Sequence, residues 1–304
     1  MRFRNATLFV VLAVAWGSAF TAIKAGLEYF PPVLFAAFRY DLAGVLMLGY
    51  AGYATDRWRP RTRNEWVLVG VGGAFMIAAY HAFLFVGEQG TTSAAAAIIV
   101  SLSPILTTGF ARVFLPDERL TTLGIAGLLV GFVGVGLLSR PDPNNLLNAR
   151  TVSMFLVFLA AASFALGSVL TRRVDADLPI ETMEAWSMLL GAGLMHVASV
   201  AIAESVSDVQ WTGEAILALG YLVVVASAAG FLIYFDLLER LGPIEINLVS
   251  YAAPVAAAAT GLAFLGETPT AYTAAGFALI VTGFVLLKRN AIRAEVTEFR
   301  AYGD

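Results

Sequence analysis

The sequence predicts an all-α membrane protein with ten transmembrane helices, arranged as two inverted five-helix repeats. Three observations lead to this prediction. Apolar residues make up 59% of the 304-residue chain and charged residues only 13%, a composition far from that of soluble domains. Long charge-free segments follow one another with short connections. Short motifs of the first half also return in the second half about 150 residues later, which indicates an internal duplication.

Nine segments of 19 to 23 residues contain no charged residue, and each can cross roughly 30 Å of hydrocarbon at about 1.5 Å per residue. In chain order they are 5–23, 66–87, 89–111, 120–139, 151–171, 185–203, 215–235, 246–266 and 268–287. A tenth segment, 31–54, has the right length but contains Arg39 and Asp41. The predicted organisation is a first repeat at 1–140, a linker loop at 141–150, a second repeat at 151–290 and a cytoplasmic tail at 291–304.

The loop arginines and lysines predict the orientation, because positive charges are retained on the cytoplasmic side. In a ten-helix arrangement only Lys24, Arg140 and Arg150 fall on one side, and all other basic loop residues fall on the side of the two termini. We therefore expect a multi-pass protein of the cell membrane, plasma or inner, with both termini in the cytoplasm. The basic block at 56–63 is interpreted as part of this topology signal, and no nucleic-acid partner is expected.

Several chemistries lack their residues in this sequence. The chain has no cysteine and two histidines, His81 and His196, and no group of histidines and acids has metal-ligand spacing. Lys24 and Lys288 are the only lysines, and neither belongs to a phosphate-binding loop. We expect no metal, no cofactor and no ATP hydrolysis. An enzyme is also not expected, because no nucleophile, base and oxyanion donor occur at usable spacing.

The duplication can be followed through its prolines and glycines. A five-helix unit that is repeated in one chain ends up inverted, because five is odd, and inverted repeats around a cavity are common in secondary transporters. Pro104 matches Pro254, and both are expected to kink their helices beside a cavity, although simple packing bends are the alternative. Glycine pairs at 127 and 134 match those at 276 and 283. These stripes predict a packing scaffold or a dimer contact, hence a monomer or a weak homodimer.

Polar and aromatic residues within the spans are candidates for a substrate cavity, because intramembrane polar groups usually face the interior of the bundle. Asn and Tyr can bind a zwitterion, and aromatic faces can hold an apolar or cationic side chain. The alternative for each residue is an interhelical hydrogen bond or a place in the aromatic belt at the membrane interface. The candidates are Trp16, Arg39, Tyr80, His81, Phe85, Ser101, Trp186, Tyr234, Asn247 and Tyr251.

Three of the titratable residues have further interpretations. Arg39 lies too deep to reach water on the lipid side, so it must face a partner or a cavity, and a structural ion pair or a helix-end contact is favoured over direct substrate binding. His81 and Glu88 are the candidates for proton coupling, since histidine titrates near physiological pH. The partners expected overall are a small-molecule substrate and the lipid bilayer.

The same residues resemble a known family. The string WGSAF at 16–20, the segment 31–39, and 93–104 leading into LPDERL at 115–120 look like the first EamA repeat of the drug/metabolite transporter superfamily. The segments 165–168 and 172–173, LGP at 241–243, Pro254 and LGE at 265–267 resemble its second repeat. The resemblance implies a ten-helix carrier that exports amino acids or other small metabolites through a central cavity. Phe164 and Leu166 depart from the family, in which a tryptophan is common in this helix.

The leading hypothesis is a secondary transporter that exports small metabolites, amino acids or related solutes, by alternating access around a central cavity. The alternative is a uniport-type facilitator, a channel or a lipid-handling protein on the same scaffold. A channel predicts flux that does not saturate and is not accelerated by solute on the other side.

Overall fold

The computed structural model describes residues 2–115, 122–139, 147–241, 246 and 248–301. This part of the chain contains ten consecutive helical spans and no strand, so the predicted fold class is confirmed. The spans of the first repeat are α1 (Arg2–Gly26), α2 (Pro32–Ala54), α3 (Arg63–Val71) with η1 (Gly72–Ala79) and α4 (Tyr80–Glu88), α5 (Ser93–Val100) with α6 (Ser103–Phe114), and α7 (Thr122–Ser139). Those of the second are α8 (Ala149–Thr171), α9 (Ile180–Ala201), α10 (Gly213–Gly220) with η3 (Tyr221–Ala229) and α11 (Gly230–Leu241), α13 (Val249–Leu265), and α14 (Ala271–Ala301). A short 3₁₀ turn, η2 (Val206–Asp208), precedes α10.

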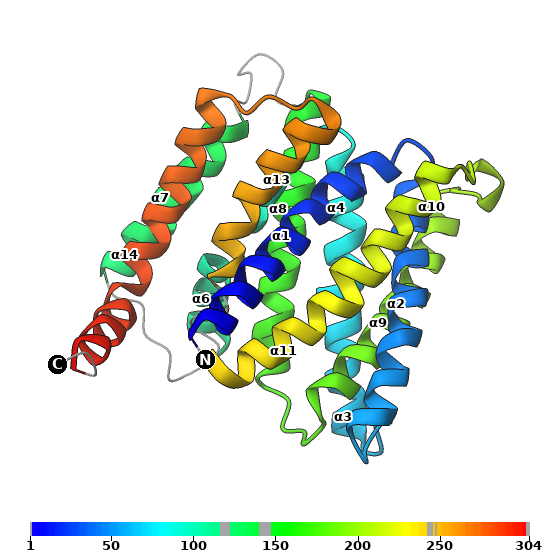
Figure 1. Cartoon of the computed structure of the whole chain (residues 1–304), viewed down its shortest axis with the longest axis horizontal. Coiled ribbons are helices and arrows are strands. Elements are labelled where there is room, and N and C mark those ends of the chain that lie inside the picture. The colour runs from blue at the N-terminus through cyan, green and yellow to red at the C-terminus, as the bar shows by residue number, and fades with distance from the viewer. Residues whose placement is uncertain (1, 116–121, 140–146, 242–245, 247, 302–304) are drawn as a thin grey trace.

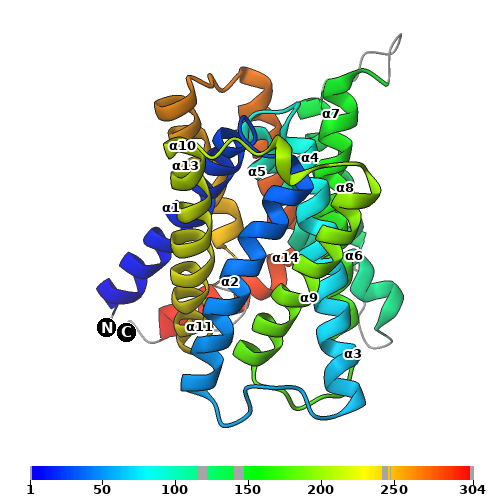
Figure 2. The same cartoon turned by 90° about the vertical axis from the view of Figure 1, so that its right-hand side faces the viewer.

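The spans run roughly side by side between two ends of the molecule. The chain begins and ends at the same end, here called the terminus end, and the other is called the opposite end (Figures 1 and 2). Six of the spans among the described residues are long and apolar enough to cross a membrane by length and composition. The short connections place successive spans antiparallel, as a multi-pass membrane protein requires.

The helix ends are satisfied by side chains, as they must be where little water is available. Pro32 occupies the first position of α2, and the Glu204 carboxylate accepts hydrogen bonds from the backbone N–H groups of Val33 and Leu34, at 3.0 and 2.8 Å. Thr62 and Glu65 form a reciprocal capping box at the start of α3. Glu204 follows α9 in the second repeat, so its bonds to α2 also join the two repeats.

The glycine stripes join α7 to α14, which lie together along one flank of the molecule (Figure 1). A Cβ atom on Gly134 would lie 2.8 Å from the carbonyl oxygen of Gly276, and one on Gly283 would lie 2.5 Å from that of Gly127. Both separations are too short for a side chain, so the two backbones touch. The stripes thus serve a close helix pair within one chain, of the kind that small residues permit in membranes.

Two spans contain π-helical segments, which periodicity did not predict. They are η1 in the third span and η3 in the eighth, at equivalent places of the two repeats. A π-helical turn releases backbone groups from regular pairing and is frequent at functional sites. A Ser163 hydroxyl donates to the Phe75 carbonyl of η1 at 3.0 Å, and the Trp16 indole donates to the Ala226 carbonyl of η3 at 3.1 Å. Each π segment is therefore bonded to the first span of the other repeat.

The paired prolines differ in their local structure. The fourth span is interrupted before Pro104, because α5 ends at Val100 and α6 begins at Ser103. Pro254 lies inside α13, which continues through it without a break. The last helix also departs from expectation, since α14 is helical through Ala301 and so includes most of the segment predicted as a tail. Residues 116–121, Arg140 and 242–245 lie outside the described residues.

Candidate functional site

A cavity of about 240 Å³ lies between the helices of the two repeats. Pockets for drug-sized ligands span roughly 300–1,000 Å³, so this one suits a smaller solute. Spans of both repeats contribute to its wall. The lining residues are Trp16, Ala19, Phe20, Ile23, Arg39, Tyr40, Met76, Ile77, Tyr80, His81, Leu84, Ala97, Val100, Ser103, Phe164, Glu184, Ala226, Phe231, Tyr234, Ser250 and Ala253.

The two ends of the cavity differ in exposure. Ile23, Leu84 and Ala97 belong to the ends of their helices that lie at the opposite end of the molecule, and each is only 2% exposed. The residues near the terminus end, Glu184 of α9 and Tyr234 of α11, are partly exposed. The lining residues nearest the terminus end are therefore more exposed than those at the opposite end.

Contacts between the repeats close the opposite end. The Thr21 hydroxyl of α1 lies 2.7 Å from the Thr260 hydroxyl of α13. The backbone N–H of Ser93 donates to the Glu267 carboxylate at 2.9 Å. Lys24 adds a contact within the first repeat, because its ammonium donates to the carbonyls of Glu88 and Gln89 at 2.8 and 2.9 Å. These contacts would have to break for the cavity to open on that side.

Arg39 is the cationic group of the cavity wall. Its backbone lies about 10 Å along the axis of α2 from Pro32, and the residue is 6% exposed. Its Nε donates to the Ser227 hydroxyl at 3.2 Å, and its guanidinium carbon lies 5.0 Å from the centre of the Tyr40 ring. Among the described residues no carboxylate lies within 4 Å of the guanidinium, so the ion pair expected from the sequence is absent from this part of the chain.

An aromatic and imidazole cluster lies beside Arg39. The Nδ1–H of His81 donates to the Ile77 carbonyl at 2.9 Å, since a carbonyl can only accept, and Nε2 lies 2.7 Å from the Tyr40 hydroxyl. A neutral His81 thus accepts from Tyr40. The Tyr80 ring is 4.4 Å from His81 and 5.5 Å from Phe164, measured between ring centres. Phe164, one of the two residues at which the chain departs from the family, therefore supplies an aromatic contact to the cavity.

Trp16 forms the other aromatic wall. Its indole ring lies 5.4 Å from the Tyr234 ring and 6.0 Å from the Phe231 ring. The hydrogen bond from its Nε1 to Ala226 fixes the indole against η3. Five of the ten predicted cavity residues line the cavity. They are Trp16, Arg39, Tyr80, His81 and Tyr234.

Four other predicted cavity residues lie outside the lining. Phe85 is fully buried, with its ring 5.3 Å from that of Phe35, and the Ser101 hydroxyl donates to the Ile98 carbonyl of its own span at 2.6 Å. The side chains of Phe85 and Ser101 therefore pack in the core and do not face the cavity.

The remaining predictions lie elsewhere too. The Tyr251 ring packs 4.4 Å from that of Phe284, and its hydroxyl has no hydrogen-bond partner in the described part of the chain. The Trp186 indole donates to the Trp58 carbonyl at 2.9 Å, near the start of α9. Asn247 lies outside the described residues.

Glu88 is the last residue of α4, at the opposite end of the molecule, and it does not line the cavity. Its side chain is fully buried, and neither carboxylate oxygen has a hydrogen-bond partner among the described residues. Leu84, one turn earlier in α4, is a lining residue. Glu88 is thus separated from the cavity by about one helical turn.

The sequence reasoning missed part of the wall. Glu184, in the first turns of α9, lines the cavity although it is not among the predicted cavity residues. Ser103 and Ser250 also line the wall. Serines at the start of helices usually indicate caps, so no simple signal distinguishes these two from capping residues.

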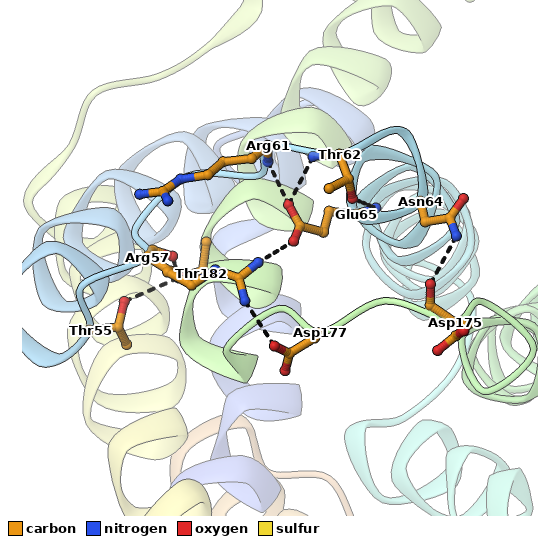
Figure 3. Close-up of polar contacts among 9 residues, drawn as sticks. All are labelled: Thr55, Arg57, Arg61, Thr62, Asn64, Glu65, Asp175, Asp177 and Thr182. Atoms are coloured by element: carbon orange, nitrogen blue, oxygen red, sulfur yellow. Dashed lines mark hydrogen bonds and ion pairs between the residues drawn. The ribbon is translucent and has the colours of Figure 1, made fainter.

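A second group of polar residues joins the repeats at the terminus end (Figure 3). The Arg57 guanidinium pairs with the Glu65 carboxylate and, at 3.0 Å, with that of Asp177. The Asn64 amide donates to the Asp175 carbonyl at 2.9 Å, and the Thr182 hydroxyl donates to the Arg57 carbonyl at 2.7 Å. These bonds tie the loop after α2 to the loop before α9.

Comparisons with known proteins agree with this architecture. The EamA-like transporter family matches residues 4–140 and 151–289. The inner membrane transporter YedA of Escherichia coli (strain K12) is 28% identical over 300 residues, covering 94% of this chain and 92% of YedA. A probable amino-acid metabolite efflux pump of Salmonella typhimurium is 28% identical over 295 residues, covering 93% of this chain and 94% of that protein. One crystal structure, 24% identical, superposes with a TM-score of 0.66 over 97% of this chain and 100% of the other.

Proposed function

We propose that this chain, which belongs to the EamA-like transporter family, is a secondary transporter that exports amino acids or closely related small metabolites by alternating access. The family and its relatives make it a membrane transporter. Its substrate class, direction and mechanism are our proposal. The observation that carries the proposal is a small cavity between inverted repeats with one buried guanidinium that has no carboxylate partner among the described residues.

Arg39 supports a substrate with an anionic group. A guanidinium in a low-dielectric site is costly unless it is paired, and it binds carboxylates through parallel N–H donors. Its one side-chain hydrogen-bond partner among the described residues, Ser227, leaves further donors of the guanidinium for a ligand. A carboxylate of the substrate would complete the pairing. The neighbouring rings of Trp16, Tyr80 and Tyr234 offer apolar faces to the rest of the solute.

Amino acids fit this description by size and charge. The cavity volume of about 240 Å³ favours a small solute. The relative from Salmonella typhimurium is named as a pump for amino-acid metabolites, which agrees with this class. Glu184 in the cavity wall offers a carboxyl group that can accept a hydrogen bond from the ammonium group of a zwitterion.

The accessible end supports the direction of export. If the termini are cytoplasmic, as the basic loops predict, then the cavity is open to the cytoplasm. An exporter in this state is ready to load its substrate. The contacts of Thr21 with Thr260 and of Ser93 with Glu267 would then form the closed outer side. Export would require the repeats to rock so that these contacts open and the terminus end closes.

Glu88 is our candidate for a coupled proton. Its buried carboxyl has no hydrogen-bond partner among the described residues, and a charged carboxylate in such a place is costly. Opening of the closed end would expose it to the outer side, where it could take up a proton and hold it as the end closes again. The proton would then leave through the cavity, one helical turn away, to the cytoplasm, so that inward proton movement accompanies export. His81 suits this role less well, since both ring nitrogens are already hydrogen-bonded. Replacement Glu88→Gln should leave substrate exchange intact and abolish acidification-driven accumulation. An unchanged proton dependence would exclude Glu88.

The function is tested by counterflow in proteoliposomes. Vesicles are loaded with one unlabelled amino acid or metabolite at a time, and entry of the labelled solute at trace concentration is followed. Saturable acceleration by internal amino acids would support a carrier. Flux that neither saturates nor responds to internal solute, with folded protein, would favour the channel alternative.

A further inference from the structure

A shallow groove at the terminus end combines tryptophans with arginines. It lies between the loop after α2, the start of α3 and the start of α9. Its lining residues are Trp58, Arg59, Pro60, Arg61, Trp66 and Trp186. We refer to it as the Trp-Arg groove. It is separate from the central cavity, since the two share no lining residue.

Three indole rings build the apolar part of this groove. The rings of Trp66 and Trp186 are 5.4 Å apart and nearly perpendicular, and the Trp186 N–H is held by the Trp58 carbonyl at 2.9 Å. Trp58 and Trp66 nevertheless remain 45% and 46% exposed. Such exposed indoles are enriched where a membrane protein meets the lipid headgroups.

Arginine supplies the polar part, and its charge is not neutralised within the described chain. The nearby acids Glu65 and Asp177 both form ion pairs with Arg57. The Arg61 backbone N–H also bonds Glu65, but its guanidinium extends away from that carboxylate (Figure 3). Arg59 and Arg61 are exposed and have no carboxylate within 4 Å among the described residues. Two guanidinium groups are therefore available to an anion.

An apolar strip continues from the groove along α9. Leu190, Leu194 and Val197 follow Trp186 at spacings that place all four on one helical face. They are 39%, 41% and 69% exposed. Gly193 lies on the same face, and a Cβ atom placed there would meet nothing within 4 Å. The strip, from Trp186 to Val197, is long enough for a hydrocarbon chain to lie along it from the groove toward the membrane centre.

We propose that the Trp-Arg groove binds an anionic phospholipid of the surrounding leaflet. The phosphate would lie between Arg59 and Arg61, the indoles would hold the glycerol region, and an acyl chain would follow the face of α9. Basic pockets of this kind bind anionic headgroups at the membrane surface. A free phosphate would use the arginines only, whereas a phospholipid also uses the indoles and the apolar strip. Because residues of both repeats line the groove, a bound lipid would contact both halves of the molecule.

The experiment uses the purified full chain in an uncharged detergent. Phosphatidylglycerol with brominated acyl chains is titrated in, and quenching of tryptophan fluorescence is followed. Brominated phosphatidylcholine provides the comparison, and inorganic phosphate is added as a competitor. We expect saturable quenching by phosphatidylglycerol at concentrations about 10- to 30-fold lower than by phosphatidylcholine, as two arginine contacts to an anionic headgroup would give.

Two pairs of variants locate the site. The double variant Arg59→Gln/Arg61→Gln should be quenched at concentrations of the two lipids that differ by no more than about twofold. The charge-matched control Arg112→Gln/Arg173→Gln should keep the preference for phosphatidylglycerol. Trp66→Phe should lower the quenching amplitude, and Trp211→Phe, near the opposite end, should not. Equal binding of both lipids by the natural protein would overturn the proposal. So would an unchanged preference in the first double variant, or displacement of the brominated lipid by millimolar phosphate.

Discussion

Arg39 and Ser187 occupy matching positions in the two repeats, each eight residues after the proline that precedes its helix, Pro31 or Pro179. Arg39 lines the central cavity without an acidic partner among the described residues. Ser187 is buried outside the cavity lining, and its hydroxyl donates to the Val69 carbonyl at 3.3 Å. The duplicated backbone thus carries different chemistry in its two copies.

The third spans show the same division between backbone and side chains. Both contain a π-helical segment, η1 or η3, and each segment accepts a side-chain hydrogen bond from the other repeat. The first repeat then contributes Tyr80 and His81 to the cavity, whereas the second contributes Phe231 and Tyr234. Duplication supplies two similar backbone halves, and unequal side chains line the cavity between them.

The largest effect should come from removing the charge that only the first repeat provides. Replacement Arg39→Gln should lower kcat/KM for counterflow by about 10- to 150-fold, because a hydrogen bond to a charged group contributes roughly 1.5–3 kcal/mol. Arg39→Lys should retain part of the activity, since it keeps the charge but not the two-pronged geometry. Ser187→Ala, the change at the matching position of the second repeat, should leave counterflow nearly unchanged. Equal effects of Arg39→Gln and Ser187→Ala would contradict the asymmetry.

A smaller effect is expected at the two π segments. Trp16→Phe and Ser163→Ala each remove one hydrogen bond to a π-segment carbonyl, worth about 1 kcal/mol. Both should lower the melting temperature by a few degrees. Only Trp16→Phe should also change the KM of counterflow, because Trp16 lines the cavity and Ser163 does not. Changes in KM of the same size in both variants would mean that the π segments act on the substrate equally.

The smallest effects should distinguish the acids of the polar cluster at the terminus end. Glu65 is buried and receives bonds from Arg57 and from two backbone N–H groups, so Glu65→Gln should cost about 1–3 kcal/mol of unfolding free energy. Asp177 is fully exposed, and Asp177→Asn should leave the melting curve unchanged. A destabilisation by Asp177→Asn that equals that of Glu65→Gln would contradict this ranking, because the exposed loop contact would then contribute as much as the buried carboxylate.

The sequence predicted the spans well because membrane crossing imposes a simple requirement, about twenty apolar residues in a row. It also identified Arg39, Tyr80 and His81, whose polar groups stand out in apolar helices. It could not distinguish which faces turn to the cavity and which to the core. Phe85 and Ser101 share the periodicity of the lining residues, and only the packing of neighbouring helices places them in the core.

The π segments and the partners of the charges were also beyond the sequence. Residues 72–79 and 221–229 have the apolar composition of ordinary helix, and their altered pairing arises from contacts with other spans. An ion pair was expected for Arg39 because a buried charge needs compensation. The structure provides Ser227 and the Tyr40 ring instead, residues whose approach depends on how η3 and α2 pack.

The most direct test of the central claim compares an amino acid with the amine formed by removing its carboxylate. Both are loaded separately into proteoliposomes that contain the natural protein, and counterflow of the labelled amino acid is measured. If Arg39 binds the carboxylate, the amino acid should accelerate entry in a saturable manner and the amine should not. Equal acceleration by the amine would contradict the account, because the cavity would then recognise its substrate without the anionic group.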